Sequence, residues 1–270
     1  MLNEYKTYNC KILKIDTESI GSKTFTLSLP YKGFLFEPGQ YVMASLPGFG
    51  EAIFGIASNM ENKKSMQITV RKVGTLTSEL HNKKIGDIIG IRGPYGHAFP
   101  IDLAKGKNVL LVAGGIGIPP LRPVILDAVK YPKKYKKVYI FYGCRDESLL
   151  NYTKEYKEWK NVCDLSITLD NPETKKYRKG VVTTLFDLKN IPADAVAFMC
   201  GPPIMYKFVI QKLIAKGLKP ENIFVSLERH IDCGQGVCQH CAIGTKYVCK
   251  DGPVFSYAEL KDFKSWLGPI

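Results

Sequence analysis

The stretch NVLLVAGGIGIPP, residues 108–120, decides the fold class of this chain. An apolar run typical of a buried strand ends in glycines, and a segment with helical spacing, PPLRPVILDAVKY (119–131), follows directly. Glycines at such a turn let the backbone approach a pyrophosphate, and the helix N-terminus supplies amide donors. The turn departs from the GxGxxG pattern, and turns of this kind also occur as plain packing devices. The stretch predicts a strand–turn–helix unit of an α/β domain.

Downstream of this turn, apolar strands alternate with helical segments. Because parallel strands need crossover connections, this alternation predicts a parallel sheet covered by helices. The predicted strands are KKVYIFYGCR (136–145), DLSITLD (164–170), VAFMCGPP (196–203) and NIFVSLE (222–228). The predicted helices are LLNYTKEYKEWK (149–160), the short TTLFDLK (183–189) and IMYKFVIQKLIAKG (204–217).

Upstream, the sequence has a pattern that is typical of short antiparallel strands. Apolar and polar residues alternate in six segments that are separated by Gly, Pro or Asn, which predicts a closed or nearly closed antiparallel barrel. The segments are 11–17, 23–30, 40–47, 52–58, 65–73 and 87–96, and only TLTSELHNKK (75–84) looks helical among them. We therefore expect a barrel domain over 1–102, an α/β domain over 103–228 and a small C-terminal lobe over 229–270.

Three turns of the predicted α/β domain follow strands, so they meet at one edge of the sheet. Ligands of doubly wound sheets bind at this edge. Besides the first glycine turn, these are Cys200-Gly201-Pro202-Pro203 and Tyr142-Gly143-Cys144-Arg145. Arg145 can pair with a phosphate there, or it can be an ordinary surface arginine in a salt bridge.

Four of the eight cysteines lie within seventeen positions, in the pattern C-x4-C-x2-C-x7-C. They are Cys233, Cys238, Cys241 and Cys249. Thiolates bind soft metals, and the C-x4-C-x2-C run is typical of plant-type [2Fe–2S] loops. A structural zinc site usually has two symmetric CxxC pairs, whereas this pattern has only one. An iron–sulfur cluster is therefore favoured over a zinc ion or a site without metal. His230 and His240 flank the cluster, and we take them as bystanders.

Composition and charge narrow the function classes. Hydrophobic residues make up 45% and charged residues 23%, which is typical of a globular protein. No apolar run reaches membrane-spanning length and the N-terminus lacks a signal-peptide pattern, so we expect a cytoplasmic protein. The net charge of +13 comes from dispersed lysines without a nucleic-acid-binding motif. It indicates a solvated surface or a docking face for an acidic partner.

Two segments of the barrel carry a weaker signal. Phe54-Gly55-Ile56-Ala57-Ser58 belongs to one strand, and Arg71-Lys72-Val73-Gly74-Thr75-Leu76-Thr77-Ser78 joins another strand to the short helix. A helix start with Gly, Thr and Ser can hold a diphosphate, and Arg71 can add charge. By themselves these segments also fit an ordinary strand–turn–helix connection.

Taken together, these motifs resemble the ferredoxin–NADP reductase superfamily. The chain looks most similar to the branch that contains sulfhydrogenase gamma subunits and the iron–sulfur flavoprotein subunits of anaerobic sulfite reductases; dihydroorotate dehydrogenase electron-transfer subunits are more distant. The segments that carry the resemblance are GGIGIPPLRP, CGPPIMYK and CGQGVCQHCAIGTKYVCKDGPVF. Ala52 and Gly55 depart from it, because many relatives have Arg and Ser there. The x7 spacing before Cys249 is shorter than expected for the dihydroorotate branch.

The resemblance implies an FAD-binding barrel, an NAD(P)-binding domain and a [2Fe–2S] lobe. It implies cofactor-binding roles for Phe54, Gly55, Ile56, Thr69, Val70, Arg71, Gly74, Leu76, Thr77, Ser78, Gly114, Gly115, Gly117, Pro119, Arg145, Gly201, Pro202 and Pro203. Cys200 would place a thiol near the hydride-transfer site, and the four clustered cysteines would bind the [2Fe–2S] cluster. Arg145 and Lys154 suit a 2′-phosphate, but nothing decides between NADH and NADPH.

The implied function is that of a diaphorase-like electron-transfer subunit. A nicotinamide would exchange hydride with the flavin, which passes single electrons to the cluster and on to a catalytic partner such as a sulfite reductase or a hydrogenase. The first alternative is the electron-transfer subunit of dihydroorotate dehydrogenase. A more remote one is a zinc-binding module that docks nucleic acid through its positive charge.

Overall fold

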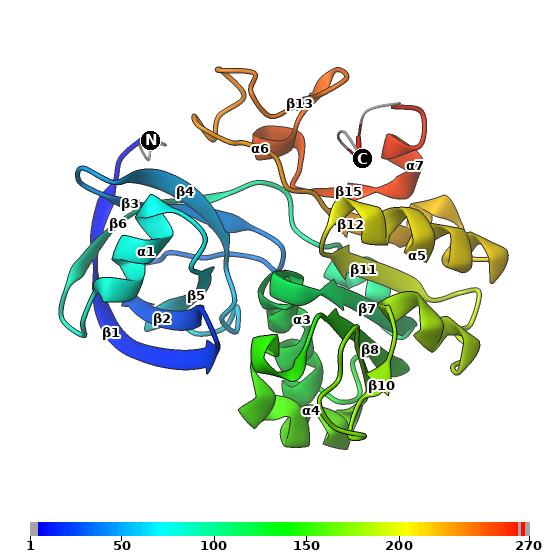
Figure 1. The fold of residues 1–270 in the computed structure, drawn as a ribbon. Coiled ribbons are helices and arrows are strands. Elements are labelled where there is room, and N and C mark those ends of the chain that lie inside the picture. Colours follow the sequence, from blue (N-terminus) through cyan, green and yellow to red (C-terminus); the bar gives the residue numbers. More distant parts are fainter. Residues whose placement is uncertain (1–4, 264–265, 268–270) are drawn as a thin grey trace.

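The computed structural model describes residues 5–263 and 266–267. It has a barrel, a helix-covered sheet and a lobe at their junction (Figure 1). The barrel strands run in the order β4-β3-β6-β1-β2-β5 and are all antiparallel. A bridge between Ile56 and Ile68 closes the sheet, which confirms the predicted barrel. The strands are β1 (Tyr8–Ser19), β2 (Ser22–Ser28), β3 (Tyr41–Leu46), β4 (Gly50–Gly55), β5 (Ser65–Arg71) and β6 (Ile88–Tyr95), and α1 (Thr75–Asn82) follows β5.

The second sheet has the order β10-β9-β8-β7-β11-β12-β15, and all of its pairs are parallel except the last. Chain order therefore reverses between β7 and β11, which is where doubly wound sheets bind ligands. The strands are β7 (Asn108–Gly114), β8 (Lys137–Cys144), β9 (Cys163–Leu169), β10 (Arg178–Lys179), β11 (Val196–Cys200), β12 (Ile223–Ser226) and β15 (Val254–Ser256).

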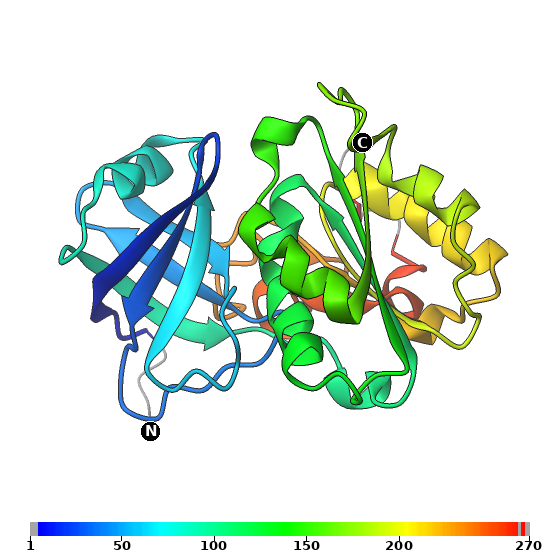
Figure 2. The ribbon, with the colours of Figure 1, turned by 90° about the horizontal axis from the view of Figure 1, so that it is seen from below.

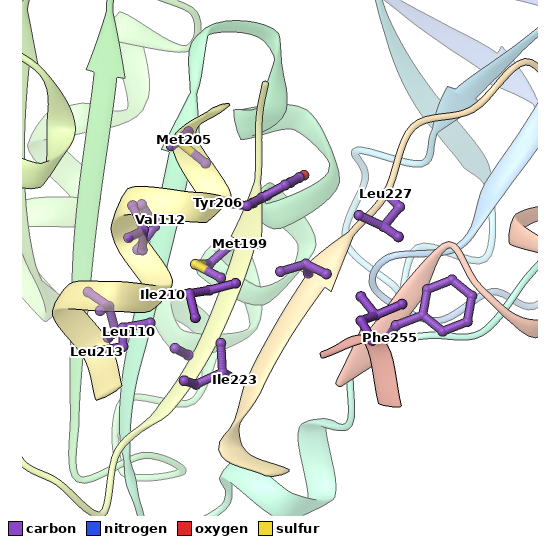
Figure 3. Packing of buried hydrophobic residues seen from close by; sticks show 14 of the residues in the cluster. Leu110, Val112, Met199, Met205, Tyr206, Ile210, Leu213, Ile223, Leu227 and Phe255 are labelled. Carbon is purple, nitrogen blue, oxygen red and sulfur yellow. The ribbon is translucent and has the colours of Figure 1, made fainter. Parts of the chain in front are cut away.

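Helices cover both faces of this sheet. On one face α3 (Ile118–Lys130) and α4 (Tyr156–Val162) bury Leu121, Ile125 and Trp159. On the other face, α5 (Pro203–Ala215) packs against β7, β11 and β12, as Figure 3 shows for Val112, Ile210 and other members of this cluster. Outside the C-terminal lobe, the remaining helical segments of the described residues are α2 (Ile101–Ala104) and short 3-10 turns, among them Glu147–Leu149, Thr153–Glu155 and Val182–Asp187.

The helix predicted over 149–160 begins later than predicted. Tyr152 has a left-handed backbone with φ of 58°, and α4 starts only at Tyr156. The left-handed turn places the buried Tyr152 hydroxyl 2.5 Å from that of Thr69 on the barrel. A contact between domains thus overrides the local helical pattern.

The C-terminal lobe is wedged between the barrel and the sheet, as two views show (Figures 1 and 2). It contains β13 (Ala242–Ile243), β14 (Lys246–Tyr247), α6 (Val248–Asp251) and α7 (Tyr257–Leu260). Its strand β15 completes the second sheet by pairing antiparallel with β12. One apolar cluster runs from Tyr41 of the barrel through Cys249 of the lobe to β12, so the lobe is packed on both sides.

A buried arginine braces the barrel against the α/β domain. Arg122 of α3 donates hydrogen bonds to the carbonyl oxygen of Ala57 at 2.6 Å and to the side chain of Gln67 at 2.8 Å, both in or beside the barrel. Glu155 neutralises its charge. The brace holds together the two domains that flank the predicted cofactor groove. Among the helices of the described residues, none is long and apolar enough to span a membrane.

Candidate functional site

A cavity of about 730 Å³ lies at the carboxyl edge of the parallel sheet. Its size is within the range of small-molecule and cofactor pockets. The three predicted turns meet there, because β7, β8 and β11 are neighbours and all end at this edge. The residues that line the cavity are Arg71, Gly114, Gly115, Ile116, Gly117, Gly143, Cys144, Arg145, Asp170, Val181, Val182, Thr183, Gly201, Pro202, Ile204, Met205, Phe208 and Glu228.

Two of the glycine turns pack directly on one another. A Cβ atom on Gly117 would lie 2.1 Å from the carbonyl oxygen of Cys200, and one on Gly114 would lie 2.7 Å from Cδ of Pro202. These glycines are therefore needed for close packing of the turns. Gly115 differs, because it has a φ of +52° and no atom within 4 Å of its Cβ position. Its backbone faces open space, as a nucleotide-binding turn requires.

Charged groups of both signs surround the cavity. Arg71 reaches it from barrel strand β5, and Arg145 follows β8. Two guanidinium groups suit the phosphates of a dinucleotide. Asp170 and Glu228 add carboxylates, and desolvation of Glu228 raises the pKa of its carboxyl above the ordinary value.

The remaining members of the predicted nucleotide site lie beside this cavity. Cys200 is 2% exposed and packs in the apolar core. Its burial raises the pKa of the thiol, and the nearby carboxylate of Glu228 raises it further. Pro119 is buried in α3, and Pro203 is exposed at the start of α5. Lys154 lines a different, smaller cavity next to Arg122, so the structure does not bring it to Arg145. Their cofactor roles stay predictions.

The predicted flavin strand packs closely on the α/β domain at Gly55. A Cβ atom on Gly55 would lie 2.7 Å from Cγ of Pro120, at the start of α3. In this chain, a side chain at position 55 would therefore clash with this proline. Ala52, where many relatives carry Arg, pairs with Ala44 of β3.

The start of α1, where a diphosphate site is predicted, is a turn fixed by side-chain hydrogen bonds. The Thr77 hydroxyl accepts hydrogen bonds from the backbone N–H groups of Val73 and Gly74, both at 2.9 Å. These bonds fix the turn, while the first amides of the helix lack partners within it and are available to an anion. Arg71 lies just before this turn, so the residues predicted to hold the diphosphate are neighbours, and their role stays a prediction.

The other predicted flavin residues lie around this groove in different settings. Thr69 bonds Thr24 at 2.8 Å as well as Tyr152, so its hydroxyl is engaged within the protein. Ile56 and Val70 point into the barrel core, and Phe54 packs against it. Leu76 is buried in α1, whereas Ser78 is half-buried. Contact of these residues with FAD stays a prediction.

The four clustered cysteines come together as two pairs. The thiols of Cys233 and Cys238 are hydrogen-bonded to each other, and so are those of Cys241 and Cys249. In addition, the amide of Cys238 donates to Sγ of Cys233 at 3.5 Å, and the amide of Cys249 donates to Sγ of Cys241 at 3.4 Å. Among the described residues, no three cysteine sulfurs lie within 4.8 Å of one another. Sulfurs about 3.8 Å apart would be needed around one zinc ion with bonds of about 2.3 Å. Two pairs fit the two irons of a [2Fe–2S] cluster better.

Backbone amides point at the sulfurs, as expected for a loop that holds thiolates. Cys233 Sγ accepts from Gln235 and Val237 at 3.3 and 3.4 Å, and Cys249 Sγ accepts from Gly236 at 3.1 Å. Burial opposes ionisation of Cys233, yet these N–H groups lower its pKa to about 6. In addition, the buried Nε2 of Gln235 lacks a hydrogen-bond partner among the described residues. An unpaired donor in this loop fits a bound group that carries acceptor atoms.

The barrel holds the cysteine loop through residues that sequence reasoning missed. Arg92 of β6 donates to the carbonyl oxygens of Asp232 and Cys233 at 3.0 and 2.7 Å. Glu51 of β4 binds the same guanidinium. Tyr41 of β3 donates to the carbonyl oxygen of Cys249 at 3.0 Å. An arginine inside the apolar segment 87–96 was the available signal for Arg92, since a buried charge needs a partner.

Three family descriptions match successive parts of the chain. Residues 9–99 match the oxidoreductase FAD-binding domain, and residues 111–211 match the oxidoreductase NAD-binding domain. Residues 228–261 match the iron–sulfur cluster binding domain of dihydroorotate dehydrogenase B. These segments coincide with the barrel, most of the α/β domain and the lobe.

Curated relatives match over nearly the whole length. The gamma subunit of sulfhydrogenase 2 from Pyrococcus furiosus is 38% identical, with 95% of this chain and 96% of the relative covered. A probable dihydroorotate dehydrogenase B (NAD⁺) electron transfer subunit from the same organism is 39% identical over 83% of this chain and 81% of its own. A solved structure of an NADH-dependent reduced ferredoxin–NADP oxidoreductase, described in connection with electron bifurcation, matches with a TM-score of 0.78 and 28% identity, covering 99% and 94% of the two chains.

Proposed function

Because this chain belongs to the ferredoxin reductase-like family of electron-transfer subunits, we propose that it carries electrons between NAD(P)H and a hydrogenase-type catalytic subunit. The predicted fold, the flavin and iron–sulfur oxidoreductase class and the binding of FAD, a nicotinamide dinucleotide and an iron–sulfur cluster are confirmed by the domain matches. The [2Fe–2S] type of the cluster is part of the proposal. The observation that carries the proposal is the placement of a paired-cysteine lobe directly on both the barrel and the sheet of the α/β domain.

FAD, when bound, supplies the step between two-electron hydride chemistry and the single-electron chemistry of an iron–sulfur cluster. The residues of the chain bind and orient the groups. Arg71 and the first amides of α1 bind the flavin diphosphate. Gly115 and Arg145 bind the nicotinamide dinucleotide at the sheet edge. The four cysteines ligate the cluster.

The remaining site residues shape the surroundings of these groups. Gly117 and Cys200 let the two glycine turns meet without a gap, which helps to exclude water from the nicotinamide end of the cavity. Glu228 lines the cavity and, since its pKa is raised, holds a proton to higher pH than an exposed carboxyl does. Arg92 and Tyr41 fix the cluster loop on the barrel and so keep the cluster at a constant distance from the flavin groove.

A hydrogenase-type partner is favoured by the length of the match. Two sulfhydrogenase gamma subunits align over 95% and 96% of this chain, whereas two dihydroorotate dehydrogenase electron transfer subunits align over 83% and 93%. A sulfite reductase partner belongs to the same proposal, since electrons delivered by a cluster lobe can serve either terminal reaction. The dihydroorotate dehydrogenase complex is the second candidate, because its iron–sulfur domain description matches residues 228–261.

We place the protein in the cytoplasm. Its eight cysteines are all free in the described structure, and four of them must stay reduced to bind a cluster. Such a set of thiols suits a reducing compartment.

The test is an anaerobic visible spectrum of the purified chain, with iron, zinc and flavin quantified before and after addition of NADH or NADPH. We expect about two irons and about one FAD per chain, and bleaching by one of the nucleotides. Cys241→Ser is expected to lose iron and retain FAD, whereas Cys163→Ser, outside the cluster, retains both. A zinc-containing chain without flavin would refute the proposal.

The partner is tested on the complex isolated anaerobically with its native catalytic subunit. NAD(P)H-dependent hydrogen evolution or sulfite reduction supports the proposed partner class. Dihydroorotate-dependent reduction of NAD⁺ by the complex would instead establish the second candidate.

A further inference from the structure

Three exposed side chains converge on the outer face of the lobe. His230 and Asp232 precede the first cluster cysteine, and His240 lies between the second and third. Their ligand atoms all lie within 4.8 Å of one another. Within residues 5–263 and 266–267, this is the one such group of three or more His, Cys, Asp or Glu ligand atoms. No sequence pattern predicts that the two histidines meet, since they are ten positions apart.

The carboxylate of Asp232 lies between the two imidazoles. Its Oδ1 is 2.8 Å from Nε2 of His230, and its Oδ2 contacts Nδ1 of His240. The two imidazole rings are 6.0 Å apart and tilted by 35°. In a tetrahedral zinc site with bonds of about 2.0–2.1 Å, ligand atoms lie about 3.3 Å apart. Small side-chain rotations therefore bring all three ligands onto one ion.

The backbone that carries this group is held in place. Arg92 of barrel strand β6 donates a hydrogen bond of 3.0 Å to the carbonyl oxygen of Asp232, so the barrel fixes the backbone of this segment. The side chains themselves face solvent, with exposed fractions of 80% for His230, 44% for Asp232 and 59% for His240. Three ligands on an open surface leave further coordination positions free.

The chemistry of this group differs from that of the cysteine pairs. Thiolates select iron–sulfur clusters, whereas imidazole together with carboxylate suits Zn²⁺ and the neighbouring divalent transition metals. Mg²⁺ prefers oxygen ligands and keeps several waters, so it fits poorly here. The two sites are thus chemically distinct although they share one loop.

We propose that His230, Asp232 and His240 form a second metal site, which binds one Zn²⁺-class ion on the outer face of the lobe. Three protein ligands and an open position are the arrangement of an accessible site rather than a closed structural one. The open position takes water, or a ligand atom of a subunit that docks on the lobe. The site requires only the folded loop and is independent of which catalytic subunit the chain serves.

The test is Zn²⁺ binding by the anaerobic holoprotein, measured by equilibrium dialysis with metal analysis. We expect about one Zn²⁺ per chain, and a loss of affinity of at least about tenfold in His230→Gln and in His240→Gln, as for metal sites that lose a supporting group. The matched control is His97→Gln, which changes an exposed histidine outside the group and should bind like the parent chain. Mg²⁺ should not compete.

Zinc-edge X-ray absorption of the loaded holoprotein identifies the ligands. Nitrogen and oxygen neighbours at about 2.0–2.1 Å support the site, while sulfur neighbours at about 2.3 Å would mean that zinc had entered the cysteine pairs. Iron–sulfur absorption must stay unchanged during loading. Sulfur ligation, loss of this absorption, or equal zinc binding by the parent chain and a variant that carries both His230→Gln and His240→Gln would each overturn the proposal.

Discussion

Arg92 Nη1 on barrel strand β6 donates a hydrogen bond of 2.7 Å to the carbonyl oxygen of Cys233, the first of the four clustered cysteines. Arg92 as a whole is only 7% exposed, and its guanidinium is paired with Glu51. The cysteine loop is therefore attached to the barrel by a charged group whose own position is fixed.

Replacement of this arginine should loosen the lobe. Arg92→Ala leaves Glu51 without its partner and two loop carbonyls without a donor, and we expect the free energy of unfolding to fall by about 2–4 kcal/mol. NAD(P)H should still reduce the flavin, whereas iron should be lost faster from the cluster. Denaturant unfolding, iron release to a chelator and stopped-flow absorption measure the three effects. Arg178→Ala, at an exposed arginine of β10, is the control; equal iron release from both variants would contradict the prediction.

The two central glycines of the first turn should respond differently to alanine. In Gly117→Ala the new Cβ would lie 2.1 Å from the carbonyl oxygen of Cys200, so the two turns must separate. We expect a loss of about 3 kcal/mol in stability and a large drop in NAD(P)H affinity.

In Gly115→Ala the new methyl group meets no atom, and only the left-handed backbone with φ of +52° is strained. This variant should lose about 1 kcal/mol. Denaturant unfolding and nucleotide titration compare the two variants. Similar losses in both would show that the turns adjust to each other more easily than the packing indicates.

The apolar–polar alternation of the first hundred residues, the later alternation of strands and helices, and the cysteine spacing were sufficient to predict the barrel, the parallel sheet and an iron–sulfur lobe. Strand β15 was not predicted, because three residues, Val254–Ser256, are too few to show periodicity. Its place depends on the open edge of β12, which only the folded sheet provides. The late start of α4 was missed for a similar reason, since the buried contact of Tyr152 with the barrel overrides the local pattern. The meeting of His230 with His240 likewise depends on the path of the loop.

The departure at Gly55 leads to a test by double substitution. Gly55→Ser restores the residue of many relatives, but its Cβ would lie 2.7 Å from Cγ of Pro120. Overpacking of this kind should cost about 1–3 kcal/mol. Pro120→Ala removes the ring, so the double variant should regain most of the loss. A double-mutant cycle of unfolding free energies measures this coupling. Additive losses would show that Pro120 does not determine the residue at position 55.

Removal of the unpaired side-chain amide of Gln235 should have different effects on the chain without its cluster and on the chain with its cluster bound. Nε2 is buried without a hydrogen-bond partner among the described residues, which costs about 1–3 kcal/mol. Gln235→Leu should therefore stabilise the chain from which the cluster has been removed by a chelator. With the cluster bound, sulfur acceptors lie next to this loop, and loss of a donor should lower the midpoint potential, because hydrogen bonds to the sulfurs raise it.

Denaturant unfolding of the stripped chain and a redox titration followed by electron paramagnetic resonance measure the two effects of Gln235→Leu. Gln211→Leu, at an exposed glutamine of α5, controls for a change of glutamine to leucine elsewhere. If Gln235→Leu stabilises both forms and leaves the midpoint potential unchanged, the Gln235 amide does not donate a hydrogen bond to the bound cluster. A lower potential together with a more stable stripped chain means that the chain keeps an unfavourable buried donor because the bound cluster requires it.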